Sequence, residues 1–444
     1  MRPFTRAELL LNAARIARDF PSFSLRPYQS PGAIERYQLQ RIQKLVKHAE
    51  AAVPLYREKF RRAGVTAKDL RSLRDFEHFP TTTKAEVLAA YPDGCLARGL
   101  DLGRCLLSKS SGSTGTVLDV VHRADPVAVQ GLAMNRLLSL YGPYLPWDRF
   151  VYVYTAPYPA ASLFGAWPMV FVPTLAKTRD IAAKLIELKP ALLACYPSHL
   201  RAIADELGPE RARALGLRAI SVSSEASTAR ERRSLGRIFG CGVFDEYSTE
   251  ELTRVAAQCR YGTYHLFEDV TYLEILDASG APTSGVGDVV GTYLHNDAMP
   301  FIRYRQGDLA SVSHRACACG IRFRAIDALV GRELSSFQLP SGRVLTSGYL
   351  LDASYSFLFD VGADIAAFTI TQETRERVVI ELVPGKTFSA PMRDAVRTRF
   401  LELVDEPLDV QVEVVPEVRR SAAGKHTPIV SHLRPTTRQG TSSS

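Results

Sequence analysis

The sequence predicts an α/β fold: a large amino-terminal region built on a layered, largely parallel sheet, then a β-rich segment, then a small α+β unit. Helical patterns alternate with short apolar runs in the first part of the chain, and from residue 264 β-rich segments with turn residues replace them. Toward the carboxyl end come two strands, a helix and a further strand. Helices that separate short apolar strands favour parallel α/β layering.

The elements of the first region follow from hydrophobic periodicity. Residues 1–20 place apolar positions at helical spacing opposite arginines, and Glu8 and Asp19 make a docked surface helix a better interpretation than an acid-poor targeting segment. Residues 33–52 and 180–190 also have helical patterns. The predicted strands of this region are short and apolar, at residues 149–157, 191–198, 218–224 and 242–248.

The rest of the chain divides in the same way. Alternating β-rich segments with turns at their ends cover residues 264–282, 287–295 and 301–313. Strands are predicted at 363–372, 377–385 and 408–417, with a helix at 390–404. The tail, residues 436–444, is polar and weakly patterned, which predicts disorder.

Composition limits the class of protein. A chain of 444 residues suggests two or three domains, and contents of 46% hydrophobic and 23% charged residues are typical of a soluble globular protein. The net charge of +8 is spread along the chain without a block of five like charges, so anionic small molecules account for it and nucleic acid is not expected as a partner. No apolar run approaches a membrane span, and we expect a cytoplasmic protein.

A loop of small residues is the first candidate site. An apolar run at residues 106–107 leads into six small residues, Ser110 to Gly115, and then into a β-branched run. Backbone N–H groups in such a turn can converge on an anion, and hydroxyls add donors without bulk. The loop is not GxxxxGK[ST], because Thr116 follows Gly115 and a strand, not a helix, is predicted after it. From these residues alone, a phosphate loop and a polar hairpin turn are equal alternatives.

Four of the chain's Cys and His residues could form a second site. Cys259 precedes His265 by six residues, and Cys317 and Cys319 lie further along the chain. Three thiolates and one imidazole make a complete tetrahedral ligand set for structural Zn²⁺. The spacing is not that of a standard zinc finger, so three buried thiols and a surface histidine are the alternative.

Motifs in a fixed order give the chain a family resemblance. "KLVKHAEAAVPLYREKF" and "FPTTTKAEV" are followed by "SSGSTGT", "SVSSEAS", "DEYSTEE", "YRQGDL", "VGR" and "SAAGKH" over more than 300 residues. In this order they resemble the adenylate-forming enzymes, in particular the phenylacetate-CoA ligase branch and its CapK-like relatives. The resemblance implies an adenylate-forming domain at residues 1–332 and a mobile α+β lid domain at 333–435. It also favours zinc, since this branch often carries a Cys/His site at these places.

The resemblance also implies roles for individual residues. Lys425 would be the catalytic lysine, and Glu251 would hold Mg²⁺, although adjacent Glu250 occupies the family's Ser or Thr position and leaves the choice between the two open. Ser335 and Ser336 stand where the family has a charged hinge residue. The residues implied to bind ATP or AMP are Ser110, Ser111, Gly112, Ser113, Thr114, Gly115, Ser223, Ser224, Glu225, Glu246, Tyr247, Asp308 and Arg332.

The implied chemistry has two half-reactions. A small carboxylic acid attacks the α-phosphate of ATP, and Lys425 bridges the two anions; rotation of the lid then presents acyl-AMP for thioester formation with CoA. A trans-acting carrier protein or an amine is the alternative acceptor. A catalytically lapsed nucleotide-binding protein and a zinc-stabilised nucleic-acid-binding protein are alternatives of other classes.

The acid itself is not determined by the sequence. Residues 153–168 are expected to contribute an aromatic wall, with Tyr158, Phe164 and Trp167 as candidates for the acyl pocket. An aryl or small hydrophobic acid is the preferred substrate class, and an amino acid is the alternative. The oligomeric state stays open, with a homodimer as one option.

Overall fold

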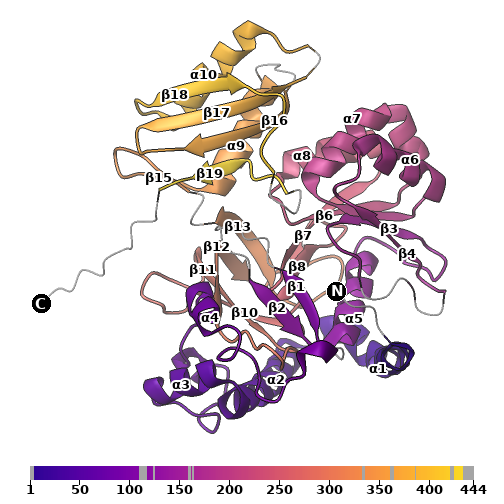
Figure 1. The fold of residues 1–444 in the computed structure, drawn as a ribbon, viewed down its shortest axis with the longest axis vertical. Coiled ribbons are helices and arrows are strands. Elements are labelled where there is room, and N and C mark those ends of the chain that lie inside the picture. The colour runs from indigo at the N-terminus through magenta and orange to yellow at the C-terminus, as the bar shows by residue number, and fades with distance from the viewer. Residues whose placement is uncertain are drawn as a thin grey trace, which may run out of the picture.

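The computed structural model describes residues 5–109, 118–123, 126–158, 162, 165–332, 336–360, 365–385, 387–420 and 425–433. The predicted phosphate loop (Ser110 to Gly115), Phe164, Ser335 and the tail lie outside these residues. A large mixed sheet and a separate four-stranded sheet are the main features of the described part (Figure 1). The four-stranded sheet lies at one end of the molecule and the amino-terminal helices lie at the other.

The large sheet is continuous, in the order β10-β11-β12-β13-β9-β8-β7-β6-β5-β3-β4. Its strands are β3 (Phe150–Tyr154), β4 (Met169–Pro173), β5 (Leu192–Cys195), β6 (Ala219–Ser223), β7 (Gly242–Thr249), β8 (Thr253–Gln258), β9 (Tyr264–Leu266), β10 (Thr271–Leu276), β11 (Gly287–Tyr293), β12 (Tyr304–Ser313) and β13 (Ala325–Arg332). Neighbours from β4 to β7 pair in parallel. Those from β7 to β10 pair antiparallel. The sequence pattern changes from alternating helices and strands to β-rich segments. In the structure this corresponds to a change from parallel to antiparallel pairing within one sheet.

The parallel half is covered by three helices, α6 (Thr178–Leu188), α7 (Pro197–Ala214) and α8 (Ala229–Phe239) (Figure 1). The apolar runs of β5 and β6 are buried along their whole length, as expected for strands covered on both faces. Leu193 and Ile220 from these strands share one core with Leu185, Leu200 and Leu235 from the helices. This packing fixes where the carboxyl ends of the parallel strands emerge.

The amino-terminal helices pack around the antiparallel half. They are α1 (Arg6–Leu25), α2 (Pro31–Ala52), α3 (Pro54–Ala63), α4 (Lys84–Ala90) and α5 (Pro126–Ser139), with 3₁₀ turns η1 (Arg26–Tyr28), η2 (Asp75–His78) and η3 (Leu102–Arg104). The predicted surface helix is α1, in which Asn12 and Phe23 are buried. The hairpin of β1 (Leu106–Lys109) and β2 (Asp119–His122) flanks the predicted phosphate loop, as the sequence predicts. None of the helices in the described ranges combines the length and apolar character needed to cross a membrane.

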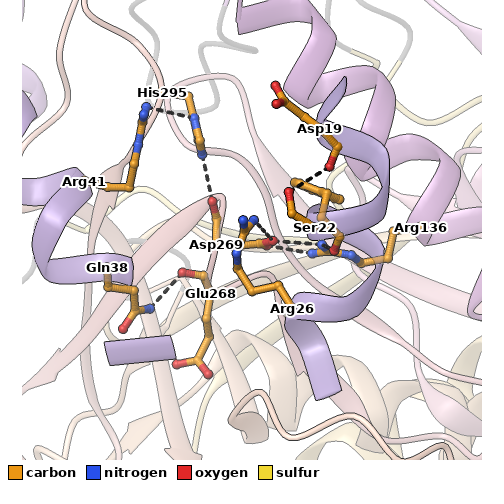
Figure 2. Close-up of polar contacts among 10 residues, drawn as sticks. Asp19, Ser22, Arg26, Gln38, Arg41, Arg136, Glu268, Asp269 and His295 are labelled. Carbon is orange, nitrogen blue, oxygen red and sulfur yellow. Dashed lines mark hydrogen bonds and ion pairs between the residues drawn. The ribbon is translucent and has the colours of Figure 1, made fainter. Parts of the chain in front are cut away.

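A buried ionic cluster fastens α1 and η1 to the rest of the molecule (Figure 2). Asp269 has no exposed side-chain surface. Its carboxylate accepts hydrogen bonds from Nη1 and Nη2 of Arg136 on α5, at 2.6 and 2.8 Å. Arg26 of η1 donates to the same carboxylate at 3.1 Å. Burial opposes ionisation, but the attraction of Arg136 and Arg26 outweighs it and lowers the pKa of Asp269.

Further hydrogen bonds extend this cluster into the core. The backbone carbonyl of Asp269 accepts from His295 at 2.7 Å, and the carbonyl of Glu268 accepts from Gln38 on α2 at 2.8 Å (Figure 2). The Arg136 guanidinium also lies over the ring of Phe23, 3.7 Å from its centre. The amino-terminal helices are therefore joined to the residues between β9 and β10 by polar contacts as well as by apolar packing.

The carboxyl-terminal unit has its own sheet and core. It contains β14 (Phe337–Gln338), β15 (Val344–Leu345), α9 (Ser347–Asp360), β16 (Ile365–Gln372), β17 (Arg377–Pro384), α10 (Ala390–Val404), β18 (Asp409–Val414) and β19 (Ile429–Ser431), with sheet order β18-β17-β16-β19. The four predicted elements are present. Sequence reasoning missed α9, whose apolar residues show no clear helical stripe, and β19, which is three residues long and pairs in parallel with β16.

Candidate active site

The candidate site lies at the carboxyl edge of the parallel strands. Tyr196 follows β5, Ser223 ends β6, and Tyr247 lies in the last part of β7. Because β5, β6 and β7 are parallel neighbours, these residues emerge along one edge of the sheet. Ser224 has a φ of 69°, so the chain turns sharply after β6.

Two residues predicted to bind the nucleotide, Tyr247 and Asp308, are joined by a hydrogen bond. The Tyr247 hydroxyl donates to the Asp308 carboxylate at 2.6 Å, and Asp308 is buried. Asp308 on β12 pairs in register with Arg332 on β13. The structure thus brings the "DEYSTEE", "YRQGDL" and "VGR" segments together, although their contacts with adenine and ribose stay predictions.

The adjacent carboxylates Glu250 and Glu251 have different surroundings. Glu251 is buried and accepts from the Tyr304 hydroxyl of β12 at 3.3 Å. Solvent reaches Glu250, yet the protein packed around its carboxylate raises its pKa, while the side chain of Ser108 and the ammonium of Lys425 act against this rise. Glu250 therefore lies within electrostatic range of Lys425 and near Ser108 of β1, the strand that enters the predicted phosphate loop. The assignment of Mg²⁺ to Glu251 stays a prediction.

Lys425 reaches this edge from the carboxyl-terminal unit. Its ammonium lies over the ring of Tyr196, 5.5 Å from the ring centre. The backbones of Arg420 and His426 form an isolated antiparallel bridge, and Lys425 directly precedes His426. We call the three described residues Arg420, Lys425 and His426 the Lys425 loop. This loop is the point at which the second sheet unit meets the site.

Glu225 contacts the Lys425 loop and the start of α7. Its carboxylate accepts from the backbone N–H and the hydroxyl of Ser198, both at 3.0 Å, and from the backbone N–H of His426 at 2.7 Å. The family resemblance implies nucleotide binding for Glu225, and that role stays a prediction.

Aromatic and charged side chains line the strands behind this edge. Tyr154 and Ser223 share a hydrogen bond of 2.7 Å, and the buried Glu246 pairs with Arg254 of β8 at 2.9 Å. Burial raises the pKa of Glu246, and Arg254 opposes the rise. The predicted nucleotide residue Glu246 is therefore held in an internal ion pair.

The residues predicted for the acyl pocket have separate surroundings. The Tyr158 ring lies 4.8 Å from that of Tyr152, and Arg254 approaches its hydroxyl at 3.5 Å. Trp167 instead donates its indole N–H to the carbonyl of Tyr144 at 3.3 Å. Tyr158 thus lies next to Arg254 of the Glu246–Arg254 pair, and no hydrogen bond or ring contact among the described residues joins Tyr158 to Trp167.

The four candidate zinc ligands come together. The Cys259 and Cys317 sulfurs are 3.6 Å apart, and the Cys319 sulfur is 3.1 Å from Nε2 of His265. The four ligand atoms all lie within 4.8 Å of one another. Ligand atoms around a tetrahedral metal with Zn–S bonds of about 2.3 Å are about 3.8 Å apart, so the set fits zinc. The alternative of a surface histidine is wrong, because His265 is buried.

Several residues of this region were missed from the sequence. Tyr196 could have been found, because it directly follows a predicted parallel strand. Arg420 and Ser198 carry no local signal, since their importance comes from a contact between segments 222 residues apart in the chain.

Comparisons with known proteins support the predicted family resemblance. No family model matches it. It is 28% identical over 315 residues to the phenylacetate-coenzyme A ligase of Thermus thermophilus, across 66% of this chain and 69% of that protein. It is 30% identical over 299 residues to the phenylacetate-coenzyme A ligase of Escherichia coli, across 62% of this chain and 66% of that protein. The chain is therefore similar to phenylacetate-CoA ligases, as the order of its motifs predicts.

The fold of the chain also matches solved structures. With 21% identity and a TM-score of 0.75, it is similar to 2-hydroxyisobutyryl-CoA ligase in the postadenylation state with R3-HIB-AMP, across 92% of this chain and 91% of that one. The TM-score falls to 0.62 for the same ligase with 2-HIB-AMP and CoA in the thioesterification state, at the same coverage. The predicted α/β fold class is confirmed.

Proposed function

We propose that this protein activates a small carboxylic acid with ATP, releases pyrophosphate, and transfers the acyl group from acyl-AMP to CoA. The observation that supports this most is the place of the Lys425 ammonium over Tyr196, at the sheet edge that also carries Tyr247 of the Tyr247–Asp308 pair, in a chain similar to phenylacetate-CoA ligases over 315 residues. Joining two anions requires positive charge and fixed orientation. Lys425 supplies both from a separate unit.

Each residue of the site has a separate role in this proposal. Lys425 bridges the attacking carboxylate and the α-phosphate, while Asp308 accepts hydrogen bonds from the ribose hydroxyls and Tyr247 faces adenine. A carboxylate of the Glu250–Glu251 pair holds Mg²⁺, which neutralises phosphate charge when bound. We further propose that residues 333–435 act as a lid domain that turns against residues 1–332 between the half-reactions.

The direct test is ATP–pyrophosphate exchange with aryl, fatty and amino acids, followed by thioester detection with CoA. Exchange with one acid class and CoA-dependent thioester support the proposal. Exchange without thioester, but with acyl transfer to a carrier protein or hydroxylamine, favours the alternative acceptors. An absence of exchange with every acid, in protein that binds ATP, supports a lapsed enzyme.

We also propose that Cys259, His265, Cys317 and Cys319 hold one structural Zn²⁺. The site joins the β8–β9 hairpin to the loop between β12 and β13, and that loop contacts η1 where the N–H of Arg322 donates to the carbonyl of Pro27 at 2.7 Å. Zinc bound there would fasten the amino-terminal segment to the sheet, so that metal binding contributes to folding.

The zinc proposal predicts a coupled loss of metal and stability. Cys319→Ser should remove stoichiometric zinc from purified protein and lower its melting temperature, because three remaining ligands bind zinc weakly. Cys241→Ser, a change of a cysteine outside the cluster, is the control and should keep both. Elemental analysis and thermal unfolding provide the measurements; wild-type protein without one zinc per chain contradicts the proposal.

A further inference from the structure

The contacts of Glu225 join two units that must separate if the lid turns. Ser198 lies in the first turn of α7, whose N-cap Tyr196 provides no side-chain cap. A carboxylate that accepts both the N–H and the hydroxyl of Ser198 caps the helix from outside, where the helix dipole favours negative charge. The large unit thus holds Glu225 in a fixed position.

The other side of the contact is the loop that carries Lys425. The N–H of His426 donates to Glu225 at 2.7 Å, and Nη1 of Arg420 donates to the Ser198 hydroxyl at 3.0 Å. Arg420 and His426 also pair through their backbones, so the contact of Arg420 with Ser198 and the contact of His426 with Glu225 hold the same backbone bridge. Lys425 lies immediately before the His426 amide.

The same loop is anchored in its own unit. The imidazole of His426 is buried, and its Nε2 lies 3.3 Å from the hydroxyl of Thr369 on β16. A displacement of the His426 amide from Glu225 would therefore move the loop together with the second sheet. The Glu225 contact consequently exists in one arrangement of the two units and is lost in any arrangement that separates them.

We propose that Glu225 is a positioning residue for the first half-reaction. Its carboxylate binds the His426 N–H directly and Arg420 through Ser198, and these contacts keep Lys425 at the reacting anions. This rests on the proposed function. The arrangement of the chain is more similar to the postadenylation state of 2-hydroxyisobutyryl-CoA ligase than to its thioesterification state. Release of this contact accompanies the turn toward CoA, so the carboxylate favours activation and not transfer.

Glu225→Gln tests the assignment with little change in shape. The glutamine amide keeps one acceptor oxygen and replaces the other with an NH₂ donor. The N–H groups of Ser198 and His426, which donate to the two carboxylate oxygens in the wild type, would then compete for one oxygen. We expect the exchange kcat to fall about 10-fold, equivalent to about 1.4 kcal/mol. The rate of thioester formation from supplied acyl-AMP and the KM for ATP should stay within about two-fold of wild type. Glu210→Gln, the same change at an exposed position of α7, is the control and should alter neither rate.

Other outcomes overturn the proposal. A rise in the KM for ATP without a fall in kcat would assign Glu225 to nucleotide binding. An equal loss in both half-reactions with a lower melting temperature would assign it to the stability of α7. Ser198→Ala provides a second variant that removes only the hydroxyl contacts, and it should shift the same half-reaction less.

Amide hydrogen exchange tests the contact without any need for activity. The peptide containing His426 should exchange faster in Glu225→Gln than in wild type or Glu210→Gln, because its N–H loses a charged acceptor. Unchanged protection overturns the proposal even if the enzyme is active. Faster exchange in a protein that activates no acid would instead leave the contact established and refute the proposed function.

Discussion

Lys425→Ala should lower the rate of ATP–pyrophosphate exchange at least 100-fold. A cation placed between two reacting anions acts mainly in the transition state, and loss of one preorganised electrostatic donor typically costs a factor of about 10²–10³. The apparent affinity for ATP should change much less. The position of the Lys425 ammonium over Tyr196 and within electrostatic range of Glu250 places it at the sheet edge where the other predicted nucleotide residues gather.

The second half-reaction separates a catalytic lysine from a structural one. If the lid turns, Lys425 is remote from the acyl group during transfer, and the variant given acyl-AMP should form thioester at nearly the wild-type rate. Lys47→Ala, an exposed lysine on α2, is the matched control and should show wild-type exchange. Full exchange in Lys425→Ala would refute the assignment. Equal loss in both half-reactions would point to misfolding or to a lid that does not turn.

Asp269→Asn should destabilise the protein by about 3–5 kcal/mol, because it removes the buried charge that Arg136 and Arg26 share. Two guanidinium groups would then remain in a region with little access to water. Asp288→Asn, which weakens a half-buried pair with Arg305, is the matched control and should cost at most about 1 kcal/mol. Urea unfolding followed by intrinsic fluorescence measures both. Equal midpoints for the two variants would contradict the importance of the cluster.

The pH dependence of the same pair of proteins provides an independent check. The pKa of Asp269 is lower in the folded protein than in the unfolded chain. Its contribution is therefore complete above the unfolded value of about 3.9 and is lost as the pH falls through the folded value. The difference in stability between wild type and Asp269→Asn should be constant near neutral pH and should shrink in strong acid.

The helices and strands that the sequence predicts correctly are those with a clear local hydrophobic pattern. The apolar runs of β5 and β6 and the periodic helix α10 lie where the sequence places them, because burial on a repeating face leaves a repeating pattern. The helix α9 and the strand β19 were missed for the opposite reason. An apolar segment without a stripe and a three-residue strand depend on packing partners that a local window does not contain.

The site divides in a similar way. Tyr247, Asp308 and Lys425 could be proposed as site residues from the sequence, because each lies in a short motif whose order along the chain resembles that of a family. The partners of Glu225 could not, because Ser198 and His426 are 27 and 201 residues away from it. The same applies to Arg136, which meets Asp269 across 133 residues.

The α/β class, the order of the motifs and the Cys/His set proposed to bind zinc could be predicted without the structure, since these depend on residue type, period and spacing along the chain. The tertiary structure was needed to show that Lys425 acts electrostatically on Glu250, that Asp269 joins the amino-terminal helices, and that Glu225 contacts the Lys425 loop. Such contacts depend on how distant segments pack against a common sheet edge. Hydrogen bonds and ion pairs act over a few ångströms in space, and separation along the chain does not reveal them.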